Sequence, residues 1–179
     1  MSETITNEVF IALGSNIAPR SEYIQRAENH LKKISQGSIL KSPIYETPPL
    51  GPGIQRKYLN QVLLLHTILS PLDLLKYCKR GEQLLGRKNR VKWASREIDI
   101  DILIYGQDQF QNEILTIPHP EIKNRQFVLR PMLDLNPKLI IPGSNLSVEQ
   151  MYQNAVSIQG ESEIELYNLK KSNKYAPAK

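Results

Sequence analysis

Residues 98–104 constrain the fold most, because apolar and acidic side chains alternate along them in the order IDIDILI. Side chains at positions i and i+2 of a β-strand share a face. The isoleucines at 98, 100, 102 and 104 are therefore expected to face a core, while Asp99 and Asp101 point together to the opposite side. A period of two residues predicts a strand with one buried face.

A run of cations leads directly into this acidic face: Arg87, Lys88, Arg90, Lys92 and Arg96. Two neighbouring carboxylates suit Mg²⁺, which keeps several waters and bridges to phosphate oxygens. The cations would hold the phosphates, so the segment favours metal-assisted chemistry on a polyphosphate. The alternative is a half-exposed strand with an acidic outer face after a solvated basic loop, and this segment alone leaves both interpretations open.

Composition limits the class of protein. The chain has 179 residues, 40% of them hydrophobic, and no apolar run approaches the roughly 18 residues that span a membrane. One cysteine, Cys78, excludes an internal disulfide framework, and with an N-terminus unlike a signal peptide it predicts a cytoplasmic location. The net charge of +5 predicts an anionic partner. Because the cations gather in one loop, a phosphorylated small molecule is favoured over nucleic acid.

The order of apolar segments predicts an α+β fold. The expected strands are 8–14, 39–46, 59–69 and 99–105, and the expected helices are 21–34 and 70–86. This βαββαβ order is the ferredoxin-like arrangement, with both helices on one face of an antiparallel sheet. C-terminal additions follow as a loop around His119, a helix near 127–135 and an element after Ser147. Residues 1–160 are expected to form a single domain, and 161–179 a polar, flexible tail.

Local signals mark where the two expected helices begin and end. Ser21 is expected to cap the first helix. Ser70 and Asp73 form a capping pair around Pro71, which suits the first position of the second helix. Gly86 suits a left-handed cap after that helix. A turn at 106–109 is expected to lead into a short extra strand.

A second cluster of candidate residues combines TPPLG at 47–51 with YLN at 58–60. Rigid prolines hold backbone groups in place, and Asn60 offers donors and an acceptor. A flat heterocycle with alternating donors and acceptors would fit, with Tyr58 stacked on its face. The alternative is a surface loop with turn prolines and a tyrosine at the start of a strand.

A third cluster begins at His119, which lies between two prolines and is followed by Arg125 and Phe127. Its cationic and aromatic neighbours favour a binding role over a structural one. The chain contains neither a G-x-x-x-x-G-K-[ST] phosphate loop nor a G-x-G-x-x-G turn after a strand. Phosphate binding would therefore rest on side chains and metal.

These clusters, in this order, resemble the 6-hydroxymethyl-7,8-dihydropterin pyrophosphokinase family of folate biosynthesis. The matching motifs are ALGSN (12–16), Y-x-T-P-P-L-G (45–51), Y-L-N (58–60), W-x-x-R-x-I-D-I-D-I (93–102) and P-H-P-x-x-x-x-R-x-F-V-L-x-P (118–131). The resemblance implies transfer of a pyrophosphoryl group from ATP to the hydroxymethyl oxygen of the pterin, with release of AMP. Separately from the resemblance, we expect a monomer with no nucleic-acid or membrane partner.

The resemblance implies roles for individual residues. Asp99 and Asp101 would hold two Mg²⁺ ions and, with Arg87 and Arg96, form the catalytic set. The implied substrate-binding residues are Thr47, Pro48, Leu50, Tyr58, Asn60, Trp93 and Phe127, with the ring between Tyr58 and Phe127 and Trp93 on a mobile loop. The implied ATP contacts are Glu82, Arg87, Lys88, Arg96, His119 and Arg125.

The sequence departs from the family pattern at three places. Lys79 stands where the best-studied members carry a glutamine, and Pro120 replaces a tyrosine found in some of them. The basic loop is one residue shorter, so either Lys88 or Arg90 would be its second phosphate contact. Two other functional classes are less favoured than the enzyme, namely an RNA-binding module on an open sheet and a metabolite-binding domain without catalysis.

Overall fold

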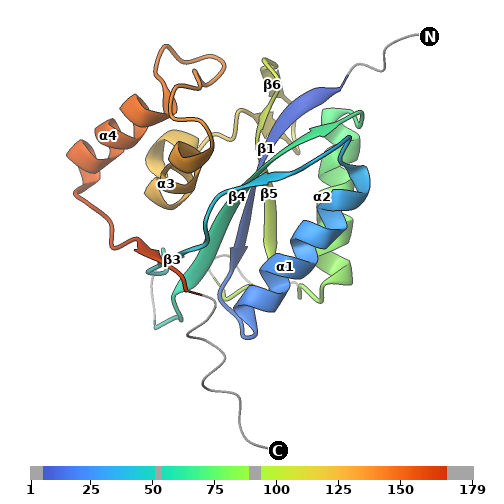
Figure 1. The fold of residues 1–179 in the computed structure, drawn as a ribbon, viewed down its shortest axis with the longest axis horizontal. Helices are drawn as coiled ribbons and strands as arrows, with labels where there is room; N and C mark the ends of the chain where they lie inside the picture. Colours follow the sequence, from blue (N-terminus) through green and yellow to red (C-terminus); the bar gives the residue numbers. More distant parts are fainter. Residues whose placement is uncertain (1–5, 51–53, 89–93, 169–179) are drawn as a thin grey trace, which may run out of the picture.

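An antiparallel sheet forms the centre of the molecule (Figure 1). The computed structural model describes residues 6–50, 54–88 and 94–168. The strands of this sheet are β1 (Asn7–Ser15), β2 (Leu40–Lys41), β3 (Tyr45–Thr47), β4 (Tyr58–Thr67), β5 (Asp99–Tyr105) and β8 (Glu165–Leu166). They follow the order β5-β1-β4-β3-β8, with β2 also paired to β4, and every pair is antiparallel. The expected combination of helices with an antiparallel sheet is thus confirmed.

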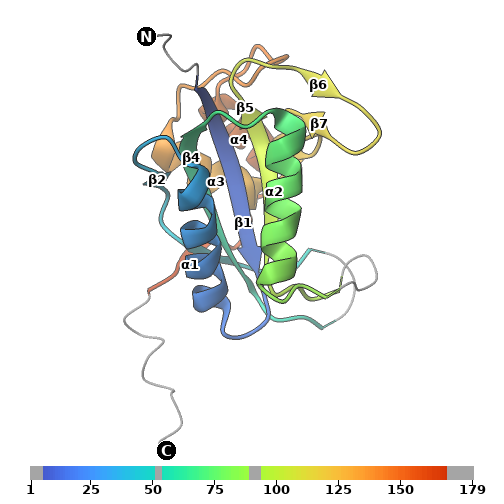
Figure 2. The ribbon, with the colours of Figure 1, turned by 90° about the vertical axis from the view of Figure 1, so that its right-hand side faces the viewer.

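Helices cover both faces of the sheet. The helices α1 (Arg20–Leu31) and α2 (Pro71–Leu84) lie side by side on one face, as Figure 2 shows from the front. The helices α3 (Gln126–Leu135) and α4 (Val148–Gln159) lie on the other. Each face has its own buried cluster of apolar side chains. The additions expected after the core therefore form a third layer.

The regular alternation of side chains between the two faces of the sheet is interrupted partway along β5. Ile98, Ile100 and Ile102 join the cluster beneath α1 and α2, as expected. Leu103 and Ile104 both join the cluster on the other face, so the expectation for Ile104 is wrong. The cause is a register shift, since Phe10 pairs with Ile104 but the next residue of β1 pairs with Ile102. Leu103 is the extra residue of a β-bulge, which interrupts the alternation.

Helix ends were predicted with mixed success. Ser70 caps α2 as expected, because its hydroxyl accepts a hydrogen bond from the Asp73 N–H at 3.3 Å. Gly86 follows the end of α2 with a φ of +91°, which favours glycine. Ser21 does not cap α1, because the helix already begins at Arg20 and its N-cap position is Pro19.

Two expected segments differ in extent from the structure. The strand expected over 39–46 is split into β2 and β3, which flank Pro43. The extra strand expected after Gly106 forms a hairpin of β6 (Phe110–Gln111) and β7 (Thr116–Ile117). Within the described part of the chain, no helix is both long and apolar enough to cross a bilayer.

The residues after α4 return to the sheet. β8 pairs with β3, so a short part of the tail expected from residue 161 forms a strand at the edge of the sheet. The remaining part of that expectation, residues 169–179, lies outside the described residues. A short 3₁₀-helix, Ile122–Asn124, connects β7 to α3.

Helix α1 approaches α2 closely at Gly81. A Cβ atom at this position would lie 2.5 Å from Cδ2 of His30, whose ring stacks on Tyr77 at 4.2 Å between centroids. We expect Gly81→Ala to lower the free energy of unfolding by about 1–3 kcal/mol through overpacking, although alanine is the better helix former. Chemical denaturation measures this change. In a His30→Ala background the same substitution should be neutral or stabilising, and an unchanged loss there would contradict the steric explanation.

Candidate active site

The register of the sheet places the acidic pair opposite the expected heterocycle-binding residues. Gly14 of β1 pairs with Asn60 on one side and with Asp99 on the other. Two residues earlier, Ala12 pairs with Val62 and with Asp101. Directly paired residues of antiparallel strands share a face. Because β1 contributes only a glycine and an alanine here, space remains between the side chains of β4 and β5.

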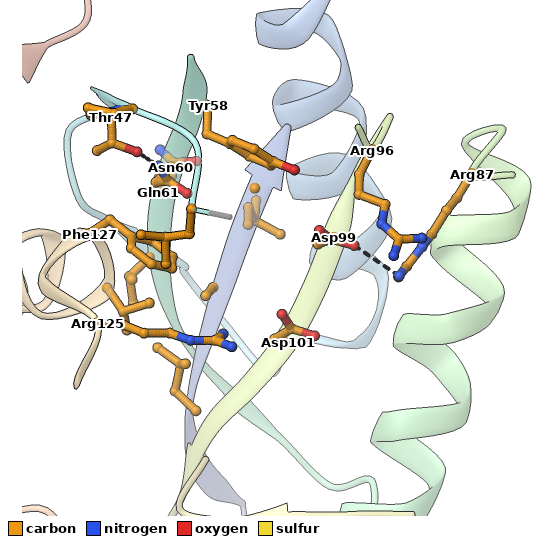
Figure 3. A pocket seen from close by; sticks show the side chains of 18 of the residues that line it. Thr47, Tyr58, Asn60, Gln61, Arg87, Arg96, Asp99, Asp101, Arg125 and Phe127 are labelled. Atoms are coloured by element: carbon orange, nitrogen blue, oxygen red, sulfur yellow. Dashed lines mark hydrogen bonds and ion pairs between the residues drawn. The ribbon is translucent and has the colours of Figure 1, made fainter. Parts of the chain in front are cut away.

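This space is a cavity of about 320 Å³ that opens between the sheet and α3 (Figure 3). Its lining includes eleven of the residues singled out in the sequence: Thr47, Pro48, Leu50, Tyr58, Asn60, Arg87, Arg96, Asp99, Asp101, Arg125 and Phe127. The structure thus gathers side chains from segments that are up to 80 residues apart in sequence, between Thr47 and Phe127.

One side of the cavity is neutral and flat. Figure 3 shows Tyr58 and Phe127 on either side of the space in front of Asn60. The Asn60 amide donates a hydrogen bond to the Thr47 hydroxyl at 2.7 Å, and both side chains are buried. This bond fixes the orientation of the amide, so its carbonyl oxygen is held toward β1, within reach of the cavity.

The other side of the cavity is charged. Arg87 contacts Asp99 at 3.0 Å between Nη2 and Oδ1 and also pairs with Glu82. Lys79 lies 3.6 Å from Asp101 and 3.0 Å from Glu82, between side-chain nitrogen and oxygen. The acidic pair is thus bounded on one side by cations that hold it in place.

Glu82 is a buried support for this charged side. Only 2% of the residue is exposed, and it is absent from the cavity lining. Its carboxylate accepts a hydrogen bond from the Ile100 N–H at 2.8 Å, between the two aspartates. With its ion pairs to Arg87 and Lys79, it positions both a cation and the strand that carries the acidic pair.

Burial shifts the pKa of several titratable groups at or beside this site, among them Asp99 and His119. Burial raises the pKa of Asp99 to about 6, and repulsion from Asp101 and Glu82 adds to the shift, while Arg87 opposes it. Burial lowers the pKa of His119, and the nearby Arg125 lowers it further. The charged form of Asp99 is therefore energetically unfavourable, and a bound cation would stabilise it.

Three of the expected ATP contacts lie apart from the cavity lining, and two further expected loop residues are not described. His119 lies beside the cavity, where its backbone N–H donates to the Leu103 carbonyl at 2.8 Å. The Lys88 N–H donates to the Glu97 carboxylate at 3.3 Å. Glu82 is the buried support described above. Trp93 lies outside the described residues, and so does Arg90, the alternative to Lys88 as second loop cation.

The sequence matches, over residues 10–137, the family model described as 7,8-dihydro-6-hydroxymethylpterin-pyrophosphokinase (HPPK). The chain belongs to the HPPK family. The pyrophosphokinase of Haemophilus influenzae is 41% identical over 148 residues, which cover 80% of this chain and 91% of that protein. The Aquifex aeolicus enzyme of the same name is 39% identical, covering 75% of this chain and 83% of that protein.

A solved structure shares the fold. The crystal structure of a Plasmodium falciparum HPPK-DHPS triple mutant with STZ-DHP superposes with a TM-score of 0.70 at 17% sequence identity. The match covers 88% of this chain and 45% of the Plasmodium chain. It supports the mixed α/β architecture with an antiparallel sheet.

Two residues of this HPPK site had no role assigned from sequence. Asn16, 1% exposed, accepts a hydrogen bond from the Arg96 N–H at 2.7 Å and donates to Ser95 Oγ at 3.2 Å. A polar residue directly after a buried strand was the available signal. Lys79 was noted only as a departure, and its contact with Asp101 depends on how α2 packs against β5.

The raised pKa of Asp99 generates a test on the metal-free protein. A folded-state pKa above the unfolded value means that stability is lost as pH rises through about 6. We expect Asp99→Asn to raise the unfolding free energy at pH 7.5 by on the order of 1–2 kcal/mol, a few degrees in melting temperature. The gain should shrink at pH 5, where Asp99 is largely protonated in the folded wild type. Scanning calorimetry at both pH values, with a chelator present, measures it. A variant that is less stable at pH 7.5 would contradict the burial effect.

Proposed function

We propose that this chain transfers the pyrophosphoryl group of ATP to the hydroxymethyl oxygen of 6-hydroxymethyl-7,8-dihydropterin, giving AMP and the pterin diphosphate in folate biosynthesis. Membership of the HPPK family supports this reaction. The observation that carries it is the cavity itself, in which a flat neutral side faces a charged side across Gly14. Such a site aligns a heterocycle with a polyphosphate.

The neutral side would bind the pterin. Tyr58 and Phe127 both line the cavity and would stack on the faces of a ring, and aromatic stacking is geometrically selective. Asn60, held by Thr47, would read the donor and acceptor edge of the pterin. Pro48 and Leu50 add apolar lining from the adjoining loop.

The charged side would bind the triphosphate. Arg87, Arg96 and Arg125 all line the cavity and offer planar donor groups suited to phosphate oxygens. Arg125 lies below Phe127, with its guanidinium 5.8 Å from the ring centroid, so it reaches toward the junction of the two sides. On the basis of the family motifs, we include His119 and Lys88 among the nucleotide contacts and Trp93 among the substrate-binding residues.

Asp99 and Asp101 fit the role of Mg²⁺ ligands. They lie on one face of β5, and hard oxygen donors are the ligands that this cation prefers. Among the described residues no cluster of three or more His, Cys, Asp or Glu side chains is available, so phosphate oxygens and water would complete the coordination. We propose two ions, which when bound would neutralise phosphate charge and polarise the hydroxymethyl oxygen.

The protein's own contribution is alignment. Phosphoryl-type transfer needs mainly positioning and charge stabilisation. The arginines hold the phosphate chain and the two rings hold the acceptor, so the reacting atoms meet above Gly14. Phe127 and Val128 of α3 form one wall of the cavity, and substrates that fill it would displace water, which otherwise competes as the acceptor.

We also propose the ferredoxin-like assignment for the first βαββαβ elements, supported by the strand order β5-β1-β4-β3 and its antiparallel pairs. One domain through residue 160, a cytoplasmic location and a monomeric state complete the proposal. A concave site bearing two carboxylates suits a small anion with metal better than a nucleic-acid backbone.

The reaction is tested by AMP formation from ATP, Mg²⁺ and the reduced pterin, followed by chromatography. We expect Asp99→Ala and Asp101→Ala each to lower kcat by at least about 100-fold, as expected for loss of a group that stabilises transition-state charge. Asp108→Ala, an exposed aspartate beyond the end of β5, is the matched control and should retain full activity. Ligand binding without AMP release by the wild type would instead indicate a non-catalytic binding domain.

The orientation of Asn60 is tested at its partner. Thr47→Val keeps the shape of the side chain but removes the hydroxyl that accepts the Asn60 hydrogen bond. We expect the KM for the pterin to rise about tenfold, because a buried amide is left without its partner. Steady-state kinetics with the pterin varied measures this. Thr47→Ser keeps the acceptor and should stay within about twofold of the wild type, and an equal loss in both variants would show that the hydroxyl has no such role.

A further inference from the structure

Three residues on the neutral side of the cavity, Thr47, Tyr58 and Phe127, are each preceded in sequence by a residue that contacts the segment after α4. We call residues 160–168 the C-terminal strap. It descends from the end of α4 and reaches β8, the red arrow beside β3 in Figure 1. The family match ends at residue 137, so the strap lies beyond it.

The first contact is made at Gln126, which precedes Phe127. The Gln126 amide donates a hydrogen bond to the Gly160 carbonyl at 2.7 Å, and its side-chain oxygen accepts one from the Ser162 N–H at 3.0 Å. Gln126 is 2% exposed. A buried amide whose donor and acceptor are both bonded to the strap fixes the start of α3, and with it the position of Phe127.

The second contact is made at β3, which ends in Thr47. Glu165 pairs with Glu46, and the Tyr167 N–H donates to the Ile44 carbonyl at 2.8 Å. The Tyr167 side chain packs against the larger apolar cluster. The strap therefore closes the edge of the sheet at the strand that carries Thr47.

The third contact is made at Lys57, which precedes Tyr58. Its ammonium group lies 3.3 Å from Glu163 and 4.0 Å from Glu165. Arg20 joins the same group, since it donates to the Lys57 carbonyl at 2.7 Å and its guanidinium lies 5.8 Å from the Tyr167 ring centroid. The strap thus contacts the chain immediately before Tyr58 directly through the exposed ion pairs of Lys57 and indirectly through Arg20, which bonds to the Lys57 backbone.

We propose that the C-terminal strap is a positioning element for the pterin side of the site. It fixes the residue before each of Thr47, Tyr58 and Phe127, and so sets the spacing of the two rings and the amide between them. The proposal rests on the proposed function for the identity of the ligand. The charged side depends on it far less, because β5 lies at the opposite edge of the sheet from β8.

A purely structural strap would make a different prediction. An edge strand can serve only to cover exposed backbone groups, and its loss would then weaken the whole protein and both ligands together. A positioning strap predicts a selective loss of pterin affinity. The two are separated by measuring both ligands on the same variants.

The first test compares two truncations. One ends at Gln159 and removes the strap, and its matched control ends at Asn168 and keeps it. Calorimetry gives the Kd of a non-hydrolysable ATP analogue with Mg²⁺, and the Kd of the pterin in the presence of that analogue. We expect the pterin Kd to rise about three- to tenfold in the shorter protein, as the loss of about one hydrogen bond's contribution implies, with the nucleotide Kd within about twofold and the control like the full chain.

A charge exchange tests the strap without removing it. Lys57→Glu should raise the pterin Kd about two- to fivefold, the range expected for an exposed ion pair. Lys57→Glu combined with Glu163→Lys restores the opposite charges and should recover most of the loss. Circular dichroism of each variant monitors folding.

The outcomes separate the proposals. Equal pterin affinity in all variants, or a parallel loss for pterin and nucleotide with a lowered melting temperature, overturns the positioning role. A charge exchange that fails to recover affinity also counts against it. Failure of the proposed function appears earlier and differently, as absence of pterin binding or AMP formation in the full-length protein.

Discussion

The register of β1 against its two neighbours is the constraint on which the site depends. Gly14 lies between Asn60 and Asp99, and Ala12 lies between Val62 and Asp101. The strand between the two functional sides thus has almost no side-chain volume where they meet. A shift of one residue would turn every side chain of β1 to the opposite face, and Leu13 would then fill the cavity.

Stability and function conflict at the charged side. A carboxylate with a pKa raised to about 6 is held in an unfavourable environment, and Glu82 adds a buried negative charge beside it. Arg87 and Lys79 offset part of this charge through ion pairs. Partial compensation is what a cation-binding site requires, since a fully neutralised pair of carboxylates would have little affinity for a metal.

The sequence predicted local features better than long-range ones. The alternation around Asp99 and Asp101 and the cap at Ser70 depend on neighbours a few residues away, so both could be read directly. The face of Ile104 could not, because the bulge arises from pairing with β1. The roles of Asn16 and Glu82 were equally hidden, since their partners lie on other segments of the chain. The motifs identified candidate residues, but only the packing of the chain showed which of them line the cavity.

The bulge at Leu103 has a consequence for how this strand tolerates change in length. Asp99 and Asp101, in the first half of β5, face the cavity. In the second half, Leu103 and Ile104 both pack beneath α3, although strict alternation would place Ile104 beneath α1 and α2. The carbonyl of that extra residue also receives the His119 N–H. Deletion of one residue at the bulge would have one of two effects. Either the aspartates would turn toward α1 and α2, or the apolar residues in the second half of β5 would lose their buried positions. Indels should therefore be excluded from this short span even where the neighbouring loops vary freely.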